Sequence, residues 1–249
     1  HTRYSTMGGS KEYNAQPLIA EGQRGTIALG HNGNVINAAE LRIEMIKEFG
    51  SSFDKTSDTE VIAELYAKAP GVDWFEVSAY AMRRLQGAYS LVIMTKDQLV
   101  AVRDPLGICP LCLGRLNGGW VVASETAALD NLEAEFIREI EHGETVVIDK
   151  DGIKSKIWSG TRSKHAMCVF EQIYFARPDS LLNGELAYET RQRLGAEVYK
   201  EHPVDADLVV GIPDSSTPHA VGLAAAAKIP YAEAIIRNRY VGRTFIEPD

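Results

Sequence analysis

The sequence predicts two domains of different classes, an α+β domain built from layered antiparallel sheets with helices and an α/β domain after it. Pairs of apolar segments flank turn sequences in the first part, which is the pattern of antiparallel hairpins: Tyr89–Thr95 with Leu99–Val102, and Thr145–Ile148 with Ile153–Ile157. Beyond residue 168, strand and helix patterns alternate as in an α/β unit. The polar stretch Ser159–Lys164 has the composition of a linker. We therefore expect domains over residues 1–160 and 161–249.

Three helices are expected in the first domain. Apolar residues recur at helical spacing within Ala39–Phe49, and Trp74–Leu85 repeats the pattern more weakly. Ser57–Glu60 has the form of a capping box, which opens a third helix. Further strands are expected at Thr26–Gly30 and Trp120–Ala123.

The second domain is expected to alternate strictly between strands and helices. In chain order, the segments are a strand at Val169–Phe175, a helix at Glu185–Lys200, a strand at Leu208–Ile212, a helix at Thr217–Lys228 and a strand at Tyr231–Ile236.

The composition limits the classes of function. With 249 residues and 45% hydrophobic content, the chain can bury ordinary cores. Its formal net charge of −8 disfavours a nucleic-acid surface, which needs a basic stripe. The small-apolar run Ala220–Ala227 is far shorter than a membrane span of about 20 residues. We expect no nucleic-acid or membrane partner, and a cytoplasmic location.

Three cysteines without a secreted-type spacing do not predict a disulfide framework. Cys109 and Cys112 have the C-x-x-C spacing of redox or zinc sites, but no second cysteine pair or histidine cluster accompanies them. We expect buried, unreactive thiols.

Three polar groups in the first domain could bind an α-amino acid. Arg3 could hold a carboxylate bidentately and Asp58 could take an ammonium group. In the run His31-Asn32-Gly33-Asn34, the side-chain N–H of Asn32 and the backbone N–H of Gly33 could face an acyl oxyanion. Each motif also has a plain structural interpretation, because His-Asn-Gly suits a hairpin turn and Ser57–Glu60 suits a helix cap.

A second group of residues could bind phosphate. Asp207–Thr217 is an apolar strand pattern followed by a hydroxyl-rich loop that opens an Ala-rich helix, and such a loop presents N–H groups to an anion. Asp, Ser and Thr are also ordinary helix caps, so both interpretations stay open. Downstream, three arginines flank Tyr240 in the sequence, namely Arg237, Arg239 and Arg243. This segment could be a lid that binds an anion or a basic edge that faces solvent.

The first group of motifs resembles the glutaminase domain of class II glutamine amidotransferases. The resemblance extends to Arg103–Leu111 and Ala123–Leu129. It implies an N-terminal-nucleophile fold in which Arg3 and Thr6 hold the carboxylate end of glutamine, Asp58 holds its α-ammonium group, and Asn32 with Gly33 forms the oxyanion hole. It also implies a nucleophilic cysteine upstream of His1. Cys109 stands where this family usually has Arg.

Two further segments, Phe170–Ser180 and Asn238–Ile246, resemble the amidophosphoribosyltransferase family. This resemblance implies a type I phosphoribosyltransferase second domain whose pyrophosphate loop is Asp214, Ser215, Ser216 and Thr217, with the Ser215 hydroxyl among the groups associated with Mg²⁺. Arg237, Tyr240 and Arg243 would belong to a flexible loop that closes over phosphoribosyl pyrophosphate. Position 237 is Arg where the family often has Lys.

Cys168 matches a position that ligates a [4Fe–4S] cluster in one branch of that family. Members without the cluster also have Cys there, so a cluster ligand and a buried structural thiol both stay open. The ribose-phosphate signature of the family, paired acids and a Gly-Thr-Thr loop, does not occur before Asp249. We therefore expect the chain to be inactive by itself.

The resemblance implies the first step of purine (IMP) biosynthesis. Glutamine hydrolysis would supply ammonia that displaces pyrophosphate from phosphoribosyl pyrophosphate and gives 5-phosphoribosylamine, in a homo-oligomer, a dimer or a tetramer. Two alternatives are an asparagine-synthetase-like amidotransferase, for which the Ser-Gly-Gly-x-Asp loop is missing from the sequence, and a non-catalytic regulator that binds glutamine or a phosphoribosyl ligand.

Overall fold

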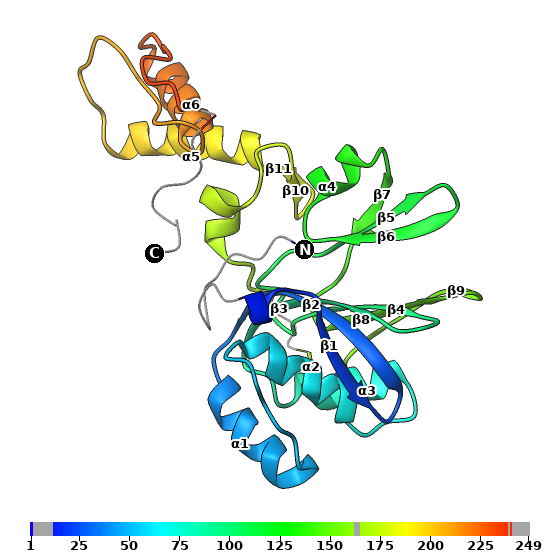
Figure 1. Ribbon diagram of the computed structural model, residues 1–249. Coiled ribbons are helices and arrows are strands. Elements are labelled where there is room, and N and C mark those ends of the chain that lie inside the picture. Colours follow the sequence, from blue (N-terminus) through cyan, green and yellow to red (C-terminus); the bar gives the residue numbers. More distant parts are fainter. Residues whose placement is uncertain (2–11, 162–164, 239, 241–249) are drawn as a thin grey trace. The chain divides into compact units, whose positions relative to one another are not determined.

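The chain forms two compact units in a computed structural model that describes residues 1, 12–161, 165–238 and 240 (Figure 1). Unit 1 comprises residues 1–124 and 128–167, and unit 2 comprises residues 125–127 and 168–249. The domain boundary predicted at 160/161 stays a prediction. No helix among the described residues is long and apolar enough to cross a membrane.

A six-stranded antiparallel sheet forms the centre of unit 1, with the strand order β1-β2-β3-β4-β8-β9. The strands are β1 (Leu18–Gly22), β2 (Gly25–Val35), β3 (Gly87–Met94), β4 (Leu99–Arg103), β8 (Glu144–Asp149) and β9 (Gly152–Ile157). Both predicted hairpins are confirmed, because β3 pairs with β4 and β8 pairs with β9. β1 was not predicted.

Three helices pack on one face of this sheet (Figure 1). They are α1 (Ala38–Phe49), α2 (Asp58–Lys68) and α3 (Trp74–Met82), and all three were predicted. Ile27 and Leu29 of β2 share a fully buried core with Ile62 and Leu65 of α2. Each such aliphatic side chain contributes about 1.5–3 kcal/mol on burial, so this core holds β2 and α2 together.

A smaller sheet of unit 1 has the strand order β6-β5-β7. Its strands are β5 (Cys112–Leu116), β6 (Gly119–Ala123) and β7 (Glu135–Glu139), and the short helix α4 (Thr126–Asn131) lies between β6 and β7 in the chain. Leu113 of β5 packs with Ala101 and Val146 of the large sheet. This packing confirms the predicted layered sheets.

The turn interpretation of the His31 motif is wrong, whereas Ser57–Glu60 does open a helix, although without the hydrogen bonds of a capping box. His31, Asn32 and Gly33 lie inside β2 and pair with β3, so they do not form a turn. Ser57 precedes α2 but its side chain makes no capping hydrogen bond. The Glu60 carboxylate accepts from the backbone N–H groups of Asp54 and Lys55, because the preceding loop folds back over it.

In unit 2, helices α5 (Ala187–Glu201) and α6 (Thr217–Ala227) pack closely against each other. An added Cβ at Gly195 would lie 1.9 Å from the carbonyl oxygen of His219, and one at Gly222 would lie 1.9 Å from that of Gln192. The two glycines therefore permit the close approach of the helix backbones. Both helices were predicted.

The strand predicted at Val169–Phe175 is wrong, since Glu171–Phe175 forms a π-helix. The buried guanidinium of Arg191 donates to the carbonyl oxygens of Gln172 and Ala176, so hydrogen bonds from α5 satisfy the end of this helical turn. The short strands β10 (Leu181–Leu182) and β11 (Glu185–Leu186) pair as a hairpin that was not predicted.

The strands predicted at Leu208–Ile212 and Tyr231–Ile236 are also largely absent among the described residues. They meet at one parallel bridge, between Val209 and Tyr231. A strand is defined by the pairing of successive residues with a neighbour, and one bridge does not extend into a ladder.

Candidate functional site

Gly33 lies at a close approach of β2 and β3. It pairs with Tyr89 and has a φ of +145°, a conformation that L side chains rarely adopt. An added Cβ would lie 2.1 Å from the carbonyl oxygen of Ala88. Glycine is therefore required at this position for the strand pair to keep its register.

Asn32 is the exposed neighbour of Gly33 on the same strand. It pairs with Ser90 of β3, and its Nδ2 donates to Oγ of Ser124 at 3.3 Å. The amide is thus held at the surface of unit 1 beside the backbone of Gly33. An exposed amide N–H and an adjacent backbone N–H are suitable donors to a developing oxyanion.

Asp58 is the first residue of α2 and is almost fully buried. Its Oδ2 accepts the backbone N–H of Val35 at 2.9 Å, and its Oδ1 accepts the backbone N–H of Thr59 at 2.9 Å. The positive end of the helix dipole favours a carboxylate there. The structure thus joins Asp58 to the strand that carries Asn32 and Gly33.

Three residues that were not predicted as site residues form a polar network next to Asp58: His31 and Thr59 contact its carboxylate, and Gln16 bonds to both of them. Nδ1 of His31 lies 3.2 Å from Oγ1 of Thr59 and 3.9 Å from Oδ2 of Asp58. Burial lowers the pKa of His31 below its ordinary value of 6.5, against the opposing charge of Asp58. Thr59 lies within a helix-cap pattern and His31 begins a turn-like pattern, so neither residue had a sequence signal of its own as a site residue.

Arg3 and Thr6, the predicted carboxylate ligands of glutamine, lie outside the described residues. Their roles stay predictions.

Arg103 and Asp104 stabilise the loop that follows β4. Both belong to the motif by which the sequence resembles class II glutamine amidotransferases. The buried Arg103 guanidinium donates to the carbonyl oxygens of Gly107, Cys109 and Ile140. Asp104 accepts from two backbone N–H groups of the same loop, although burial raises its pKa. This motif therefore has a structural role. Cys109 lies within the motif and Cys112 follows it, and both are buried thiols.

The predicted pyrophosphate loop immediately precedes α6 in unit 2. The backbone N–H of Thr217 donates to the carbonyl oxygen of Asp214 at 3.4 Å, and Oγ of Ser216 donates to the carbonyl oxygen of Ile212. Ser215 is half-buried, and its carbonyl oxygen lies 3.3 Å from Nδ1 of His219. The loop is thus a compact turn at a helix N-terminus, as the sequence suggested.

Arg237 joins this loop, because its Nη1 lies 2.9 Å from Oδ2 of Asp214. Both side chains are exposed. Tyr240 is fully exposed, and its backbone N–H donates to Oδ1 of Asn238. Arg243 lies outside the described residues, as do 239 and the remainder of 241–249.

Two metal sites were expected, a [4Fe–4S] cluster at Cys168 and Mg²⁺ at Ser215. Cys168 is half-buried, and no three His, Cys, Asp or Glu side chains of the described residues come together as metal ligands do. A [4Fe–4S] cluster needs four thiolates or equivalent ligands, of which Cys168 would supply one, so its role as a cluster ligand stays a prediction. Asp214 and Ser215 offer a carboxylate and a hydroxyl, which fit an Mg²⁺ ion that arrives with substrate phosphates.

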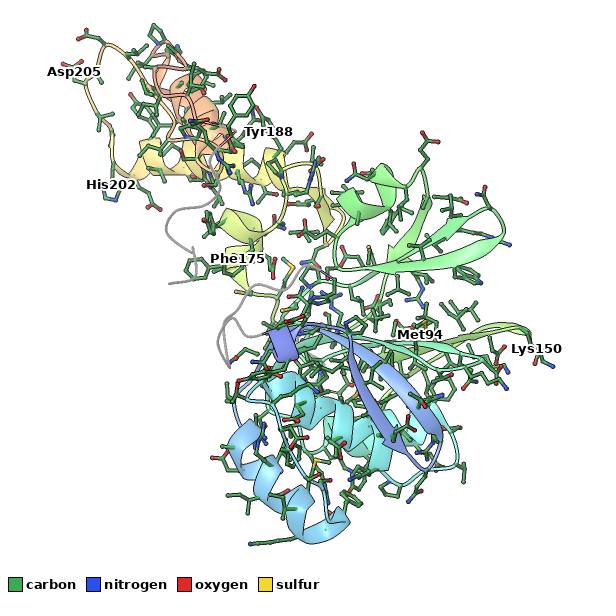
Figure 2. The ribbon with its side chains drawn as sticks, in the orientation of Figure 1. Met94, Lys150, Phe175, Tyr188, His202 and Asp205 are labelled. Carbon is green, nitrogen blue, oxygen red and sulfur yellow. The ribbon has the colours of Figure 1, made fainter. Side chains whose placement is uncertain are left out.

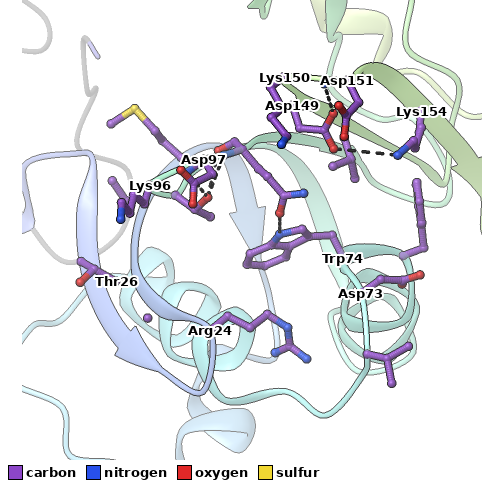
Figure 3. Close-up of a pocket in the computed structure, with 18 of the residues that line it drawn as sticks. Arg24, Thr26, Asp73, Trp74, Lys96, Asp97, Asp149, Lys150, Asp151 and Lys154 are labelled. Atoms are coloured by element: carbon purple, nitrogen blue, oxygen red, sulfur yellow. Dashed lines mark hydrogen bonds and ion pairs between the residues drawn. The ribbon is translucent and has the colours of Figure 1, made fainter.

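A recess in unit 1 is separate from these residues. It has a volume of about 1380 Å³ and lies among the turns at the ends of the strands, beside Trp74 (Figure 3). Met94 and Lys150, which line it, are labelled in Figure 2. Its charged side chains are mixed in sign, namely Arg24, Asp73, Lys96, Asp97, Asp149, Lys150, Asp151 and Lys154. None of the predicted site residues lines it.

Comparison with known proteins places these motifs in a family. The model of the glutamine amidotransferase domain matches residues 1–131. The whole chain is 48% identical to the amidophosphoribosyltransferase of Synechococcus elongatus, of which it covers 51%. It is 46% identical to amidophosphoribosyltransferase 1, chloroplastic, of Arabidopsis thaliana, of which it covers 44%. The chain thus spans about half the length of the curated relatives it matches.

Solved structures show the same similarity. All of the chain matches the glutamine phosphoribosylpyrophosphate amidotransferase of B. subtilis complexed with ADP and GMP, with 41% identity, a TM-score of 0.90 and 54% of that chain covered. A second structure, described as the allosteric regulatory enzyme of purine biosynthesis, matches with 42% identity and a TM-score of 0.90 over 53% of its length. With its domain match over more than half of its residues, the chain belongs to the glutamine amidotransferase domain family.

Proposed function

We propose that this chain is part of an amidophosphoribosyltransferase, which uses glutamine and phosphoribosyl pyrophosphate to form 5-phosphoribosylamine. The observation that supports this most is the hydrogen bond between Asp58 and the backbone of β2, because it brings an ammonium acceptor to the strand that presents Asn32 and Gly33. Whole-chain identity to enzymes of that name adds to it.

In unit 1, the residues would bind glutamine and stabilise its reacting carbonyl. The Asp58 carboxylate would accept the α-ammonium group, while Arg3 and Thr6 would take the α-carboxylate. When the protein's nucleophile attacks the amide carbon, the carbonyl oxygen becomes an oxyanion. Hydrogen bonds from Nδ2 of Asn32 and the backbone N–H of Gly33 would stabilise it, and loss of one such donor typically costs about 2.7–4 kcal/mol in transition-state stabilisation.

In unit 2, the turn before α6 would hold the pyrophosphate group. Backbone N–H groups at the start of α6 and the hydroxyl groups of Ser215, Ser216 and Thr217 can donate to phosphate oxygens. Arg237 would add a cation, because an incoming phosphate competes with Asp214 for its guanidinium. Mg²⁺ bound with the substrate would neutralise charge on the leaving pyrophosphate.

The reaction in unit 2 would be a displacement at C1 of the ribose. The lone pair of ammonia forms the C1–N bond, the C1–O bond to pyrophosphate breaks, and pyrophosphate leaves with the electron pair. The nitrogen then loses one proton to give the neutral amine.

We propose that the protein works in the cytoplasm as a homo-oligomer, a dimer or a tetramer, and size measurement in solution tests the oligomeric state.

The function is tested with the protein expressed from its native gene. Incubation with glutamine, phosphoribosyl pyrophosphate and Mg²⁺ is expected to release glutamate and pyrophosphate and to form phosphoribosylamine, and omission of phosphoribosyl pyrophosphate serves as the control. Glutamine binding without either product would favour a regulator. Amidation of an amino acid at the expense of ATP would favour an asparagine-synthetase-like enzyme. Either result would overturn the proposal.

A further inference from the structure

A chain of polar contacts connects the buried face of β2 to Asp58. The His31 side chain is 4% exposed and points to the helix-covered side of the sheet, where Nδ1 lies 3.2 Å from Oγ1 of Thr59. Thr59 follows Asp58 at the start of α2. Both its backbone N–H, at 2.9 Å, and its hydroxyl, at 3.4 Å, are directed at Oδ1 of Asp58. His31 therefore reaches the carboxylate through one hydroxyl group.

Gln16 closes this network from the other side. Its Oε1 accepts the backbone N–H of His31 at 2.6 Å, and its Nε2 donates to Oγ1 of Thr59 at 3.1 Å. One amide thus holds both the strand backbone next to Asn32 and the hydroxyl that contacts Asp58. The two hydrogen bonds of Gln16 therefore restrain the separation between Asn32 and Asp58 from the strand side and from the helix side.

The charges around Asp58 leave its carboxylate able to bind the ammonium group of a ligand. Nδ1 of His31 lies 3.9 Å from Oδ2 of Asp58, so a protonated imidazole would pair with the carboxylate and compete with an incoming ammonium group. Burial lowers the pKa of His31. The imidazole therefore stays neutral near neutral pH, and the charge of Asp58 is left for a ligand.

We propose that His31, Thr59 and Gln16 are positioning residues that orient Asp58 toward the α-ammonium group of glutamine and set its distance from Asn32 and Gly33. This inference rests on the proposed function and deepens it. None of the three needs to touch the substrate. Their effect should therefore fall on the discrimination between amides that have an α-ammonium group and amides that lack one.

The test compares glutamine with 4-carbamoylbutanoate, which is glutamine without its α-amino group. The glutaminase kcat/KM of the protein expressed from its native gene is measured for both amides in wild type, His31→Leu, His31→Asn and Asp58→Asn. Loss of one positioning hydrogen bond is expected to reduce the preference for glutamine about tenfold in His31→Leu. His31→Asn, whose amide can replace Nδ1, is expected to keep most of the preference. Formation of phosphoribosylamine from free ammonia should be unchanged in His31→Leu and His31→Asn.

Thr59→Val and Thr59→Ser give a second route if His31→Leu does not fold. The valine variant removes the hydroxyl that connects the network, and the serine variant retains it. We expect the preference for glutamine to fall about tenfold in Thr59→Val and to persist in Thr59→Ser. Equal losses for both amides in His31→Leu and Thr59→Val would indicate general disruption and would overturn the inference.

Failure of the inference is distinguishable from failure of the proposed function. A wild-type protein that hydrolyses no glutamine overturns both. A wild-type protein whose preference for glutamine depends on Asp58, but not on His31 or Thr59, overturns the positioning role and leaves the function in place.

Discussion

The backbone N–H of Val35 donates to Oδ2 of Asp58 at 2.9 Å, which joins the last residue of β2 to the first residue of α2. Asn32 and Gly33 lie on the same strand, so the proposed ammonium acceptor and the proposed oxyanion donors belong to one packed assembly of strand and helix. Rigid elements hold a substrate more precisely than loops do. The predictions for unit 1 follow from this connection.

Asp58→Asn is expected to weaken glutamine use far more than ammonia use. Loss of the partner of a desolvated ammonium group typically costs about 2–5 kcal/mol, whereas free ammonia bypasses this pocket. The measurement is the kcat/KM for phosphoribosylamine formation with each nitrogen donor. Equal losses with the two donors would reject the role of Asp58.

Gly33→Ala is expected to lower both the stability of unit 1 and its glutaminase activity, because the new Cβ would lie 2.1 Å from the carbonyl oxygen of Ala88. Gly25→Ala is the matched control, since Gly25 also has a positive φ but has open space around it. The clash should cost about 1–3 kcal/mol more than the control. Chemical denaturation measures both variants, and similar free energies of unfolding would show that β2 does not approach β3 as described.

The stability of unit 1 is expected to fall as the pH falls below 6.5, in part because of His31. Its folded pKa lies below the ordinary value of 6.5, so the unfolded chain takes up the proton first. The stabilisation is fully present above pH 6.5 and is lost as the pH falls toward the folded pKa. Thermal unfolding from about pH 8 to about pH 5 should show a smaller decline in His31→Asn than in wild type. Identical declines would contradict the buried, neutral imidazole.

Gly195→Ala is expected to destabilise unit 2 by about 1–3 kcal/mol, since an added methyl group would lie 1.9 Å from the carbonyl oxygen of His219 in α6. Gly184→Ala, at a turn with open space, is the control. Displacement of α6 also moves the turn before it, so the affinity for pyrophosphate should fall with stability. Calorimetric unfolding and pyrophosphate titration measure the two effects, and an unchanged unfolding temperature would refute the close helix packing.

The sequence was sufficient for elements whose pattern is local. The hairpin of β3 and β4 and the helix α1 follow from apolar periodicity within a few residues. Glu171–Phe175 has the aromatic and β-branched residues of a strand, but Arg191, which satisfies the carbonyl oxygens at the end of the π-helix, is far away in the chain. β7 has three exposed residues in succession, so its sequence lacks the alternation that marks a half-buried strand.

The residue types of the candidate site could be predicted, but their connections could not. The family motif indicated that Asp58 binds a ligand. Its hydrogen bond to Val35, however, depends on how α2 packs against β2. His31 and Thr59 gave no separate signal, because a histidine beside Asn-Gly suits a turn and a threonine beside Asp suits a helix start. Their contact depends on tertiary packing.

We propose that one protein releases nitrogen from glutamine and transfers it to the ribose carbon of phosphoribosyl pyrophosphate. The most direct measurement supplies amide-¹⁵N glutamine, phosphoribosyl pyrophosphate and Mg²⁺ in the presence of unlabelled ammonia, and determines the ¹⁵N content of phosphoribosylamine by mass spectrometry. The product is expected to carry the glutamine label even when unlabelled ammonia is in excess. A product labelled only in proportion to the free ammonia pool, or no phosphoribosylamine, would contradict it.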